Sequence, residues 1–238
     1  MYKILFFVLL YFPILFSQNE SHSFDLFTVI LKNNLLTVKN LDSIIIYQKK
    51  FNEPTDMTAD LDDDGVDEYL VTDAYEKNGS SYFTLFIYNT IDTFYLADSI
   101  FSGLIEPYLN ESEDLNGKII ISGKPQFDFL NSDTSDVFIP IDCWKFSDGK
   151  VELVNYQVYD AFISENDNII DYVDKYYKLN TKDCNSTKNI LAAIAAAYVN
   201  YLNASENAVG SQFLESYYFC KDVQEFKSKI INLMKENQ

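Results

Sequence analysis

The stretch from residue 60 to residue 68 is the feature that most constrains how this chain folds. Carboxylates stand at alternating positions along it, and the strand-like run Tyr69 to Thr72 follows at once. Counted from position 1, the acidic side chains at positions 1, 3, 5 and 9 are Asp60, Asp62, Asp64 and Glu68. Four carboxylates packed so closely repel one another strongly unless a cation neutralises them. The stretch therefore predicts a tight acidic turn in front of a β-strand.

The spacing of these carboxylates is typical of a calcium loop. Calcium takes oxygen ligands at about 2.4 Å, with a backbone carbonyl near position 7 and a glycine at the sharp turn. Here Gly65 stands at position 6, and the carbonyl donor would be Val66. An EF-hand also needs a glutamate at position 12, where this chain has Val71, so an EF-hand is excluded. The predicted ligands are Asp60, Asp62, Asp64, Val66 and Glu68.

The pattern Asp-x-Asp-x-Asp-Gly-x-x-Glu running into a strand resembles the calcium loop of FG-GAP and VCBS repeats, the units of integrin-type β-propellers. The resemblance covers residues 58–72 and implies that the ion stabilises a turn between two short strands. Asp63 stands where the family commonly has glycine, and Asp67 is additional, so we expect both to face solvent. A propeller requires further copies at a regular period, and the sequence has no second copy. We expect one calcium-loop unit in another kind of β domain.

The N-terminus has the features of a secretory signal peptide. Lys3 precedes the apolar run from Ile4 to Phe16, and the polar residues that follow Ser17 end it. The run is shorter than the roughly 20 apolar residues of a spanning helix, and no cysteine follows it for a lipid anchor. We expect residues 1–18 to be removed and the protein to be secreted, or to lie in the periplasm or cell envelope. Calcium is plentiful outside the cell, where weak sites stay filled.

The charge of the chain argues against several classes of partner. The formal net charge is −18, and all 18 basic residues are lysines. Nucleic acids and anionic membrane surfaces require cationic patches, so neither is an expected partner, and no stable membrane anchor is expected after cleavage. His22 is the only histidine, in a segment that we expect to be loose and solvated. Histidine-dependent hydrolysis and a histidine-ligated zinc site are therefore poorly supplied.

Apolar patterning divides the rest of the chain into a β-rich part, residues 19–156, and an α-helical part, residues 157–238. Alternating or β-branched runs, several separated by Asn-rich or Asp-Gly turns, predict strands over residues 24–31, 35–38, 43–47, 82–88, 93–96, 118–122, 137–146 and 151–154. Helical spacing predicts helices over residues 159–178, 190–199, 209–219 and 222–234. The expected fold class is α+β, with an antiparallel β domain, one calcium loop and a helical C-terminal part.

Three cysteines and the remaining carboxylates leave alternatives open. Cys184 and Cys220 flank a helical pair and are candidates for a disulfide in an oxidising compartment, which leaves Cys143 as a buried thiol. Glycoside hydrolysis needs two carboxylates that face each other. Nothing in the sequence singles out two from the candidates Glu106, Glu111, Glu113, Asp114, Asp128 and Asp142.

We expect an exported calcium-binding protein in which Ca2+ has a structural role. The leading hypothesis is a non-enzymatic binding or interaction module whose partner is a protein or a glycan. The order of the parts also resembles exported bacterial proteins with one calcium-type loop, an aromatic β domain and a helical tail. The alternatives are a calcium-dependent, glycosidase-like carboxylate hydrolase acting on an extracellular polymer, and an envelope protein or enzyme inhibitor.

Overall fold

The computed structural model describes residues 20–112, 115, 117–131 and 136–235. The expected signal peptide, residues 1–18, lies outside this part of the chain. Contacts divide the chain into two units, residues 1–49 and residues 50–238. In the described ranges no helix is both long enough and apolar enough to cross a membrane.

The first unit contains one four-stranded antiparallel sheet in the order β1-β2-β3-β4. Its strands are β1 (Glu20–Ser23), β2 (Phe27–Lys32), β3 (Leu35–Asn40) and β4 (Ile45–Lys50). The turn between β2 and β3 is made by Asn33 and Asn34, whose φ angles of 51° and 63° suit the right-handed twist of a two-residue hairpin. Alternate residues of β2 and β3, among them Val29 and Val38, are buried, as period-two patterning requires.

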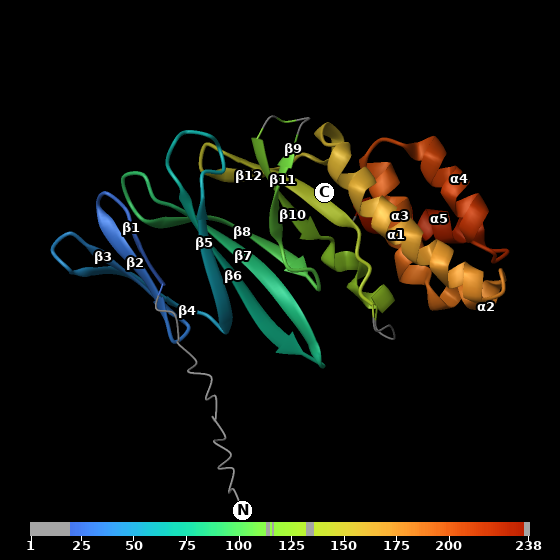
Figure 1. Cartoon of the computed structure of the whole chain (residues 1–238), viewed down its shortest axis with the longest axis horizontal. Helices are drawn as coiled ribbons and strands as arrows, with labels where there is room; N and C mark the ends of the chain where they lie inside the picture. Colours follow the sequence, from blue (N-terminus) through green and yellow to red (C-terminus); the bar gives the residue numbers. More distant parts are fainter. Residues whose placement is uncertain (1–19, 113–114, 116, 132–135, 236–238) are drawn as a thin grey trace, which may run out of the picture. The chain divides into compact units, whose positions relative to one another are not determined.

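The second unit contains two further antiparallel sheets (Figure 1). Sheet B has the order β5-β6-β7-β8, with β5 (Glu53–Ala59), β6 (Glu68–Lys77), β7 (Ser80–Asn89) and β8 (Tyr95–Gly103). Sheet C has the order β12-β11-β10-β9, with β9 (Tyr108–Ser112), β10 (Gly117–Gly123), β11 (Ile141–Ser147) and β12 (Lys150–Leu153). Short 3-10 helices η1 (Pro125–Asn131) and η2 (Asn155–Gln157) flank β11 and β12.

Sheet C is covered on both faces. One face packs against sheet B through a buried cluster that we call the inter-sheet core: Ala59, Leu61, Leu70, Leu85, Ile87, Ile100, Ile120 and Phe146. The opposite face of β10, represented by Ile119 and Ile121, packs with Phe162 of the first long helix. Consecutive isoleucines on β10 are therefore all buried, as expected for a strand that is covered on both sides.

The C-terminal helices form the third layer of this unit (Figure 1). They are α1 (Asp160–Leu179), α2 (Cys184–Asn189), α3 (Leu191–Asn203), α4 (Asn207–Tyr217) and α5 (Val223–Lys235). The alanine-rich α3 lies at the centre of the layer, and its small side chains are almost completely buried. Gly210 of α4 permits close packing on α3, because a Cβ there would lie 3.1 Å from the Cβ of Tyr201.

Buried asparagines attach α3 to sheet C. Asn200 accepts a hydrogen bond from the backbone N–H of Ile141 at 3.1 Å, and it donates to Asn166 of α1 at 3.1 Å. Asn203 donates to the carbonyl of Ile141, also at 3.1 Å. The polar groups at the start of β11 are thus satisfied by α3, as burial requires. Cys184 and Cys220, the candidate pair, form a disulfide, and Cys143 is a buried free thiol.

The predicted fold class is confirmed: the chain is α+β with three antiparallel sheets and several helices, and the described residues form neither a closed barrel nor a propeller. The change of pattern near residue 156 corresponds to the end of the strands, and α1 begins at Asp160. The prediction of a loose segment around His22 is wrong. His22 lies in β1 opposite Val29, because the backbone of this polar segment pairs with β2.

Candidate metal centre

The β5–β6 hairpin brings the two ends of the acidic loop together. Ala59, the last residue of β5, pairs with Glu68, the first residue of β6. Asp60 therefore leaves one strand where Glu68 enters the other. The loop between them turns sharply, and Asp63 and Gly65 have φ angles of 60° and 89°. Glycine reaches such angles without strain, and aspartate tolerates them better than most residues do.

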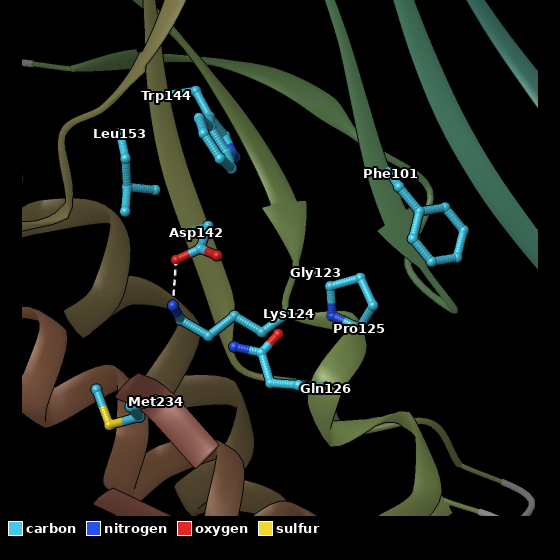
Figure 2. A pocket seen from close by; sticks show the side chains of 9 residues that line it. All are labelled: Phe101, Gly123, Lys124, Pro125, Gln126, Asp142, Trp144, Leu153 and Met234. Atoms are coloured by element: carbon cyan, nitrogen blue, oxygen red, sulfur yellow. Dashed lines mark ion pairs between the residues drawn. The ribbon is translucent and has the colours of Figure 1, made fainter. Parts of the chain in front are cut away.

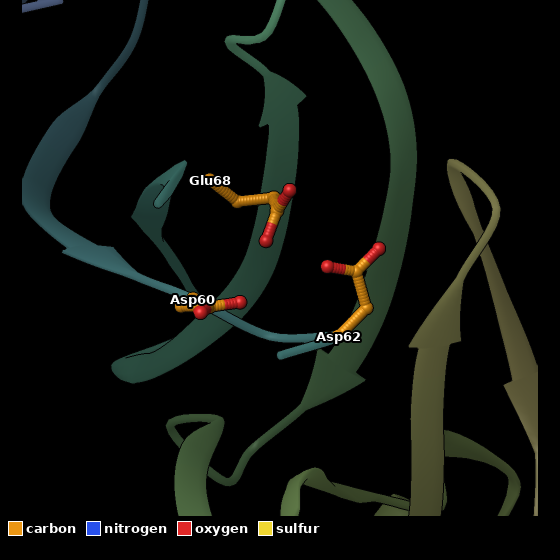
Figure 3. Close-up of side chains that lie close together, drawn as sticks. All are labelled: Asp60, Asp62 and Glu68. Carbon is orange, nitrogen blue, oxygen red and sulfur yellow. The ribbon is translucent and has the colours of Figure 1, made fainter. Parts of the chain in front are cut away.

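The hairpin gathers Asp60, Asp62 and Glu68 into one cluster (Figure 3). One carboxylate oxygen from each residue lies within 4.8 Å of those of the other two. Two oxygens on opposite sides of a calcium ion, each about 2.4 Å from it, would lie about 4.8 Å apart. The three carboxylates are therefore close enough together for one ion to contact all of them, and the cluster could hold a metal ion.

Each member of the cluster has a buried oxygen for which the described residues supply no hydrogen bond. These atoms are Oδ1 of Asp60, Oδ1 of Asp62 and Oε1 of Glu68. An isolated buried carboxylate oxygen is costly, and it normally has a donor or a cation as its partner. Three such oxygens in one cluster are the arrangement that a bound cation would satisfy.

Two carboxyl groups of the cluster have raised pKa values, because charge is costly at this partly buried site. Burial is the main cause that raises the pKa of Glu68 from 4.5 to about 7, and the nearby charges of Asp62 and Asp64 raise it further. The pKa of Asp62 is also raised, first by burial and then by Asp64. A cation among these groups would favour their ionised forms, because an opposite charge stabilises a carboxylate.

Backbone and lysine donors position the carboxylates and the loop from outside the cluster. Oε2 of Glu68 accepts from the N–H of Leu61 at 3.0 Å, and Oδ2 of Asp60 accepts from the N–H of Gly65 at 3.0 Å. Nζ of Lys118, on β10 of sheet C, donates to the backbone carbonyl of Asp60 at 3.0 Å. The sequence analysis did not identify Lys118, because 58 residues separate it from Asp60 and no motif connects them.

The other two predicted ligands lie outside this cluster. Asp64 is exposed, and its Oδ1 accepts from the N–H of Val66 at 2.7 Å, which closes a short turn. Asp64 and the carbonyl of Val66 remain predictions as ligands. Asp63 and Asp67 are both exposed, as expected.

The remaining carboxylate candidates have different surroundings. Asp142 is ion-paired with Lys124 and accepts a hydrogen bond from Asn155 at 2.6 Å. The pKa of Asp128 is raised to about 6 by burial. Glu106 and Glu111 are exposed. Glu113 and Asp114 lie outside the described residues.

Cys143 is completely buried, and burial raises the pKa of its thiol to about 12. Because the thiolate is the nucleophile, this thiol is inert, as expected for a structural cysteine.

No family model, no curated protein and no solved structure matches the chain.

Proposed function

We propose that the protein is an exported calcium-binding protein in which one structural Ca2+ fixes the β5–β6 loop, and that it acts as a non-enzymatic binding module. The observation that carries the metal assignment is the cluster of three buried carboxylate oxygens that lack donors among the described residues. Calcium-stabilised turns before a strand are what the FG-GAP and VCBS resemblance implies. The partner remains a protein or a glycan, and secretion or envelope location remains part of the proposal.

The donor set favours calcium over other cations. All three clustered ligands are carboxylates, whereas structural zinc sites are built from cysteine and histidine. Magnesium demands near-ideal octahedral geometry at about 2.1 Å and keeps several waters. Calcium accepts irregular loops and a mixture of carboxylate, carbonyl and water ligands. The exposed side of the loop, where Asp64 lies, leaves room for such additional ligands.

A structural role follows from what the loop touches. Leu61 lies between two of the ligands and is 1% exposed within the inter-sheet core. Lys118 joins the loop backbone to sheet C. A cation that fixes this loop would therefore strengthen the packing of sheet B on sheet C. The carboxylate-hydrolase alternative receives less support, because Asp142 is already engaged by Lys124 and Asn155.

The test compares two double variants of the same loop. Asp62→Ala with Asp64→Ala removes two predicted ligands, of which Asp62 belongs to the cluster. Asp63→Asn with Asp67→Ala removes two exposed charges that are not predicted ligands. Asparagine is chosen at residue 63 because φ is 60° there. Calcium at about 100 times its dissociation constant stabilises a protein by about 2.7 kcal/mol.

We expect calcium, but not magnesium, to raise the melting temperature of the wild type and of the control pair. The ligand pair should show no such rise. Equal calcium stabilisation of both pairs would show that the ligand assignment is wrong. No stabilisation of the wild type would leave the loop as a solvated acidic turn.

A further inference from the structure

A cavity of about 280 Å³ lies in the second unit, between strands of sheets B and C and the helix α5 (Figure 2). It shares no residue with the metal cluster. Asp142 and Trp144 of β11 contribute to it, and Leu153 pairs with Trp144 from β12. The remaining lining residues are Phe101, Gly123, Lys124, Pro125, Gln126 and Met234.

A buried ion pair forms part of the cavity wall. Lys124 and Asp142 are 6% and 8% exposed, and Nζ of Lys124 contacts Oδ1 of Asp142. Removing two charges from water is costly, and an apolar pair of similar volume is often at least as stable. Fold stability alone therefore gives little reason for an ion pair at this position. Because the pair lines a cavity, it is a candidate for ligand recognition.

The ion pair also retains hydrogen-bonding capacity. Lys124 and Asn155 both contact Oδ1 of Asp142, and the described residues supply no donor to Oδ2. An ammonium group has three donors, and the ion pair uses one of them. Gln126 adds an amide, which both donates and accepts. The wall thus offers donors and acceptors together, with its two charges cancelling each other.

Trp144 supplies a rigid aromatic surface beside these polar groups. Its indole N–H donates to Oγ of Ser122 at 2.8 Å, which fixes the orientation of the ring. Because the polar edge is satisfied by the protein, the ring can offer its apolar face to a ligand. Leu153 and Met234 complete an apolar portion of the lining.

We propose that this cavity binds one neutral sugar residue. Sugar hydroxyls accept from Lys124 and donate to Asp142, and the C–H face of the ring packs on Trp144. An anion is disfavoured because Asp142 neutralises Lys124 and the chain carries a charge of −18. A volume of about 280 Å³ is close to the lower end of small-molecule sites, about 300 Å³, and suits one ring. The assignment gives a ligand class to the binding role proposed above, and it rests on that role but not on the calcium site.

Trp144 is the only tryptophan in the chain, so its fluorescence reports directly on this cavity. The mature protein is titrated with the methyl glycosides of glucose, galactose, mannose and N-acetylglucosamine, in calcium and in chelator. Oligosaccharides of the same sugars distinguish a free sugar from the end of a glycan chain. Glucuronate and inorganic phosphate serve as anionic probes. We expect a saturable change with at least one neutral glycoside, and tighter binding of its oligosaccharide would identify the end of a chain.

The variants remove polar groups from the cavity wall by substitutions of similar size. Lys124→Met with Asp142→Asn neutralises the ion pair and preserves an acceptor for Asn155. Gln126→Leu changes a partly buried position that holds no ion pair. The control pair is Lys175→Met with Asp171→Asn, which makes the same chemical change at an exposed ion pair of α1.

We expect the variants at Lys124 with Asp142 and at Gln126 each to weaken glycoside binding about tenfold or more, because each removes polar contacts to the ligand. The control should bind as the wild type does. The inference is overturned by no saturable signal with any neutral glycoside, by a response to the anions alone, or by undiminished binding in the cavity variants. Sugar binding without calcium stabilisation would refute the metal assignment alone, and the reverse result would refute the sugar site alone.

Discussion

Glu68→Gln is the single substitution that best separates a metal site from an ordinary acidic turn. Glu68 is 1% exposed, its Oε2 is bonded to the N–H of Leu61, and its Oε1 has no donor among the described residues. Burial, assisted by the charges of Asp62 and Asp64, raises its pKa from 4.5 to about 7. Glutamine has nearly the same shape and removes the charge.

The direction of the effect without metal follows from that pKa. A carboxyl whose pKa is higher in the folded state contributes stability below pH 4.5, and this contribution is lost as the pH rises through about 7. The difference between 4.5 and about 7 corresponds to roughly 3 kcal/mol. This is an upper limit for the gain from glutamine, because a buried amide has its own desolvation cost. In chelator at a pH of about 8, Glu68→Gln should therefore raise the free energy of unfolding by up to about 3 kcal/mol.

Calcium should offset most of the stability lead that the variant has over the wild type in chelator. Saturating calcium at about 100 times the dissociation constant adds about 2.7 kcal/mol to the wild type. The variant lacks one ligand charge and should gain little. At about 2–4 °C per kcal/mol for a domain of this size, the wild type should gain roughly 5–11 °C in melting temperature.

The assay is urea unfolding and thermal melting at a pH of about 8, in calcium and in chelator. Asp67→Asn is the matched control, since it removes one exposed charge from the same loop and should keep the full calcium gain. A calcium gain in Glu68→Gln equal to that of the wild type would show that Glu68 is not a ligand. A variant that is less stable than the wild type in chelator would refute the argument from buried charge.

Two further predictions concern other parts of the second unit. Burial raises the pKa of Asp128 from 3.8 to about 6, so the stabilising protonated form is lost as the pH rises between these values. Asp128→Asn should therefore raise the melting temperature more at a pH of about 7 than at about 4, and an equal change at both pH values would refute this. The disulfide between Cys184 and Cys220 closes a loop with a sequence separation of 36. Replacing both cysteines by serine should lower the free energy of unfolding in urea by about 2–4 kcal/mol, and a loss well below about 1 kcal/mol would contradict the loop-entropy argument.

The strands that the sequence analysis missed share one position in the fold. β1, β5 and β9 are each at the edge of a sheet, where a strand has one paired side and needs little apolar patterning. In β5, Pro54 and several polar residues conceal the strand, and an edge is where proline is tolerated. By contrast, the turn at Asp148 and Gly149 was predicted from its residues alone. It forms with positive φ at both positions between β11 and β12.

The carboxylate cluster was predictable to the extent that it is local. Asp60, Asp62 and Glu68 were identified from spacing, and the hairpin brings them together. The placement of Asp64 was not predictable, because its bond to the N–H of Val66 depends on the shape of the turn. The contribution of Lys118 depends on the packing of sheet C against sheet B, which no local pattern of residues records.

The order Asp60-Leu61-Asp62 joins the metal cluster to the inter-sheet core. The two aspartates contribute to the cluster, while Leu61 between them contributes its side chain to the core and its N–H to Glu68. Without a cation, repulsion between the carboxylates acts on a residue that also packs between the sheets. In the proposed calcium-bound form the ion offsets this repulsion, and Leu61 stays packed between the sheets. Because Trp144 packs against the same core and lines the cavity, the acidic loop and the proposed sugar site share one layer of packing, although they share no residue.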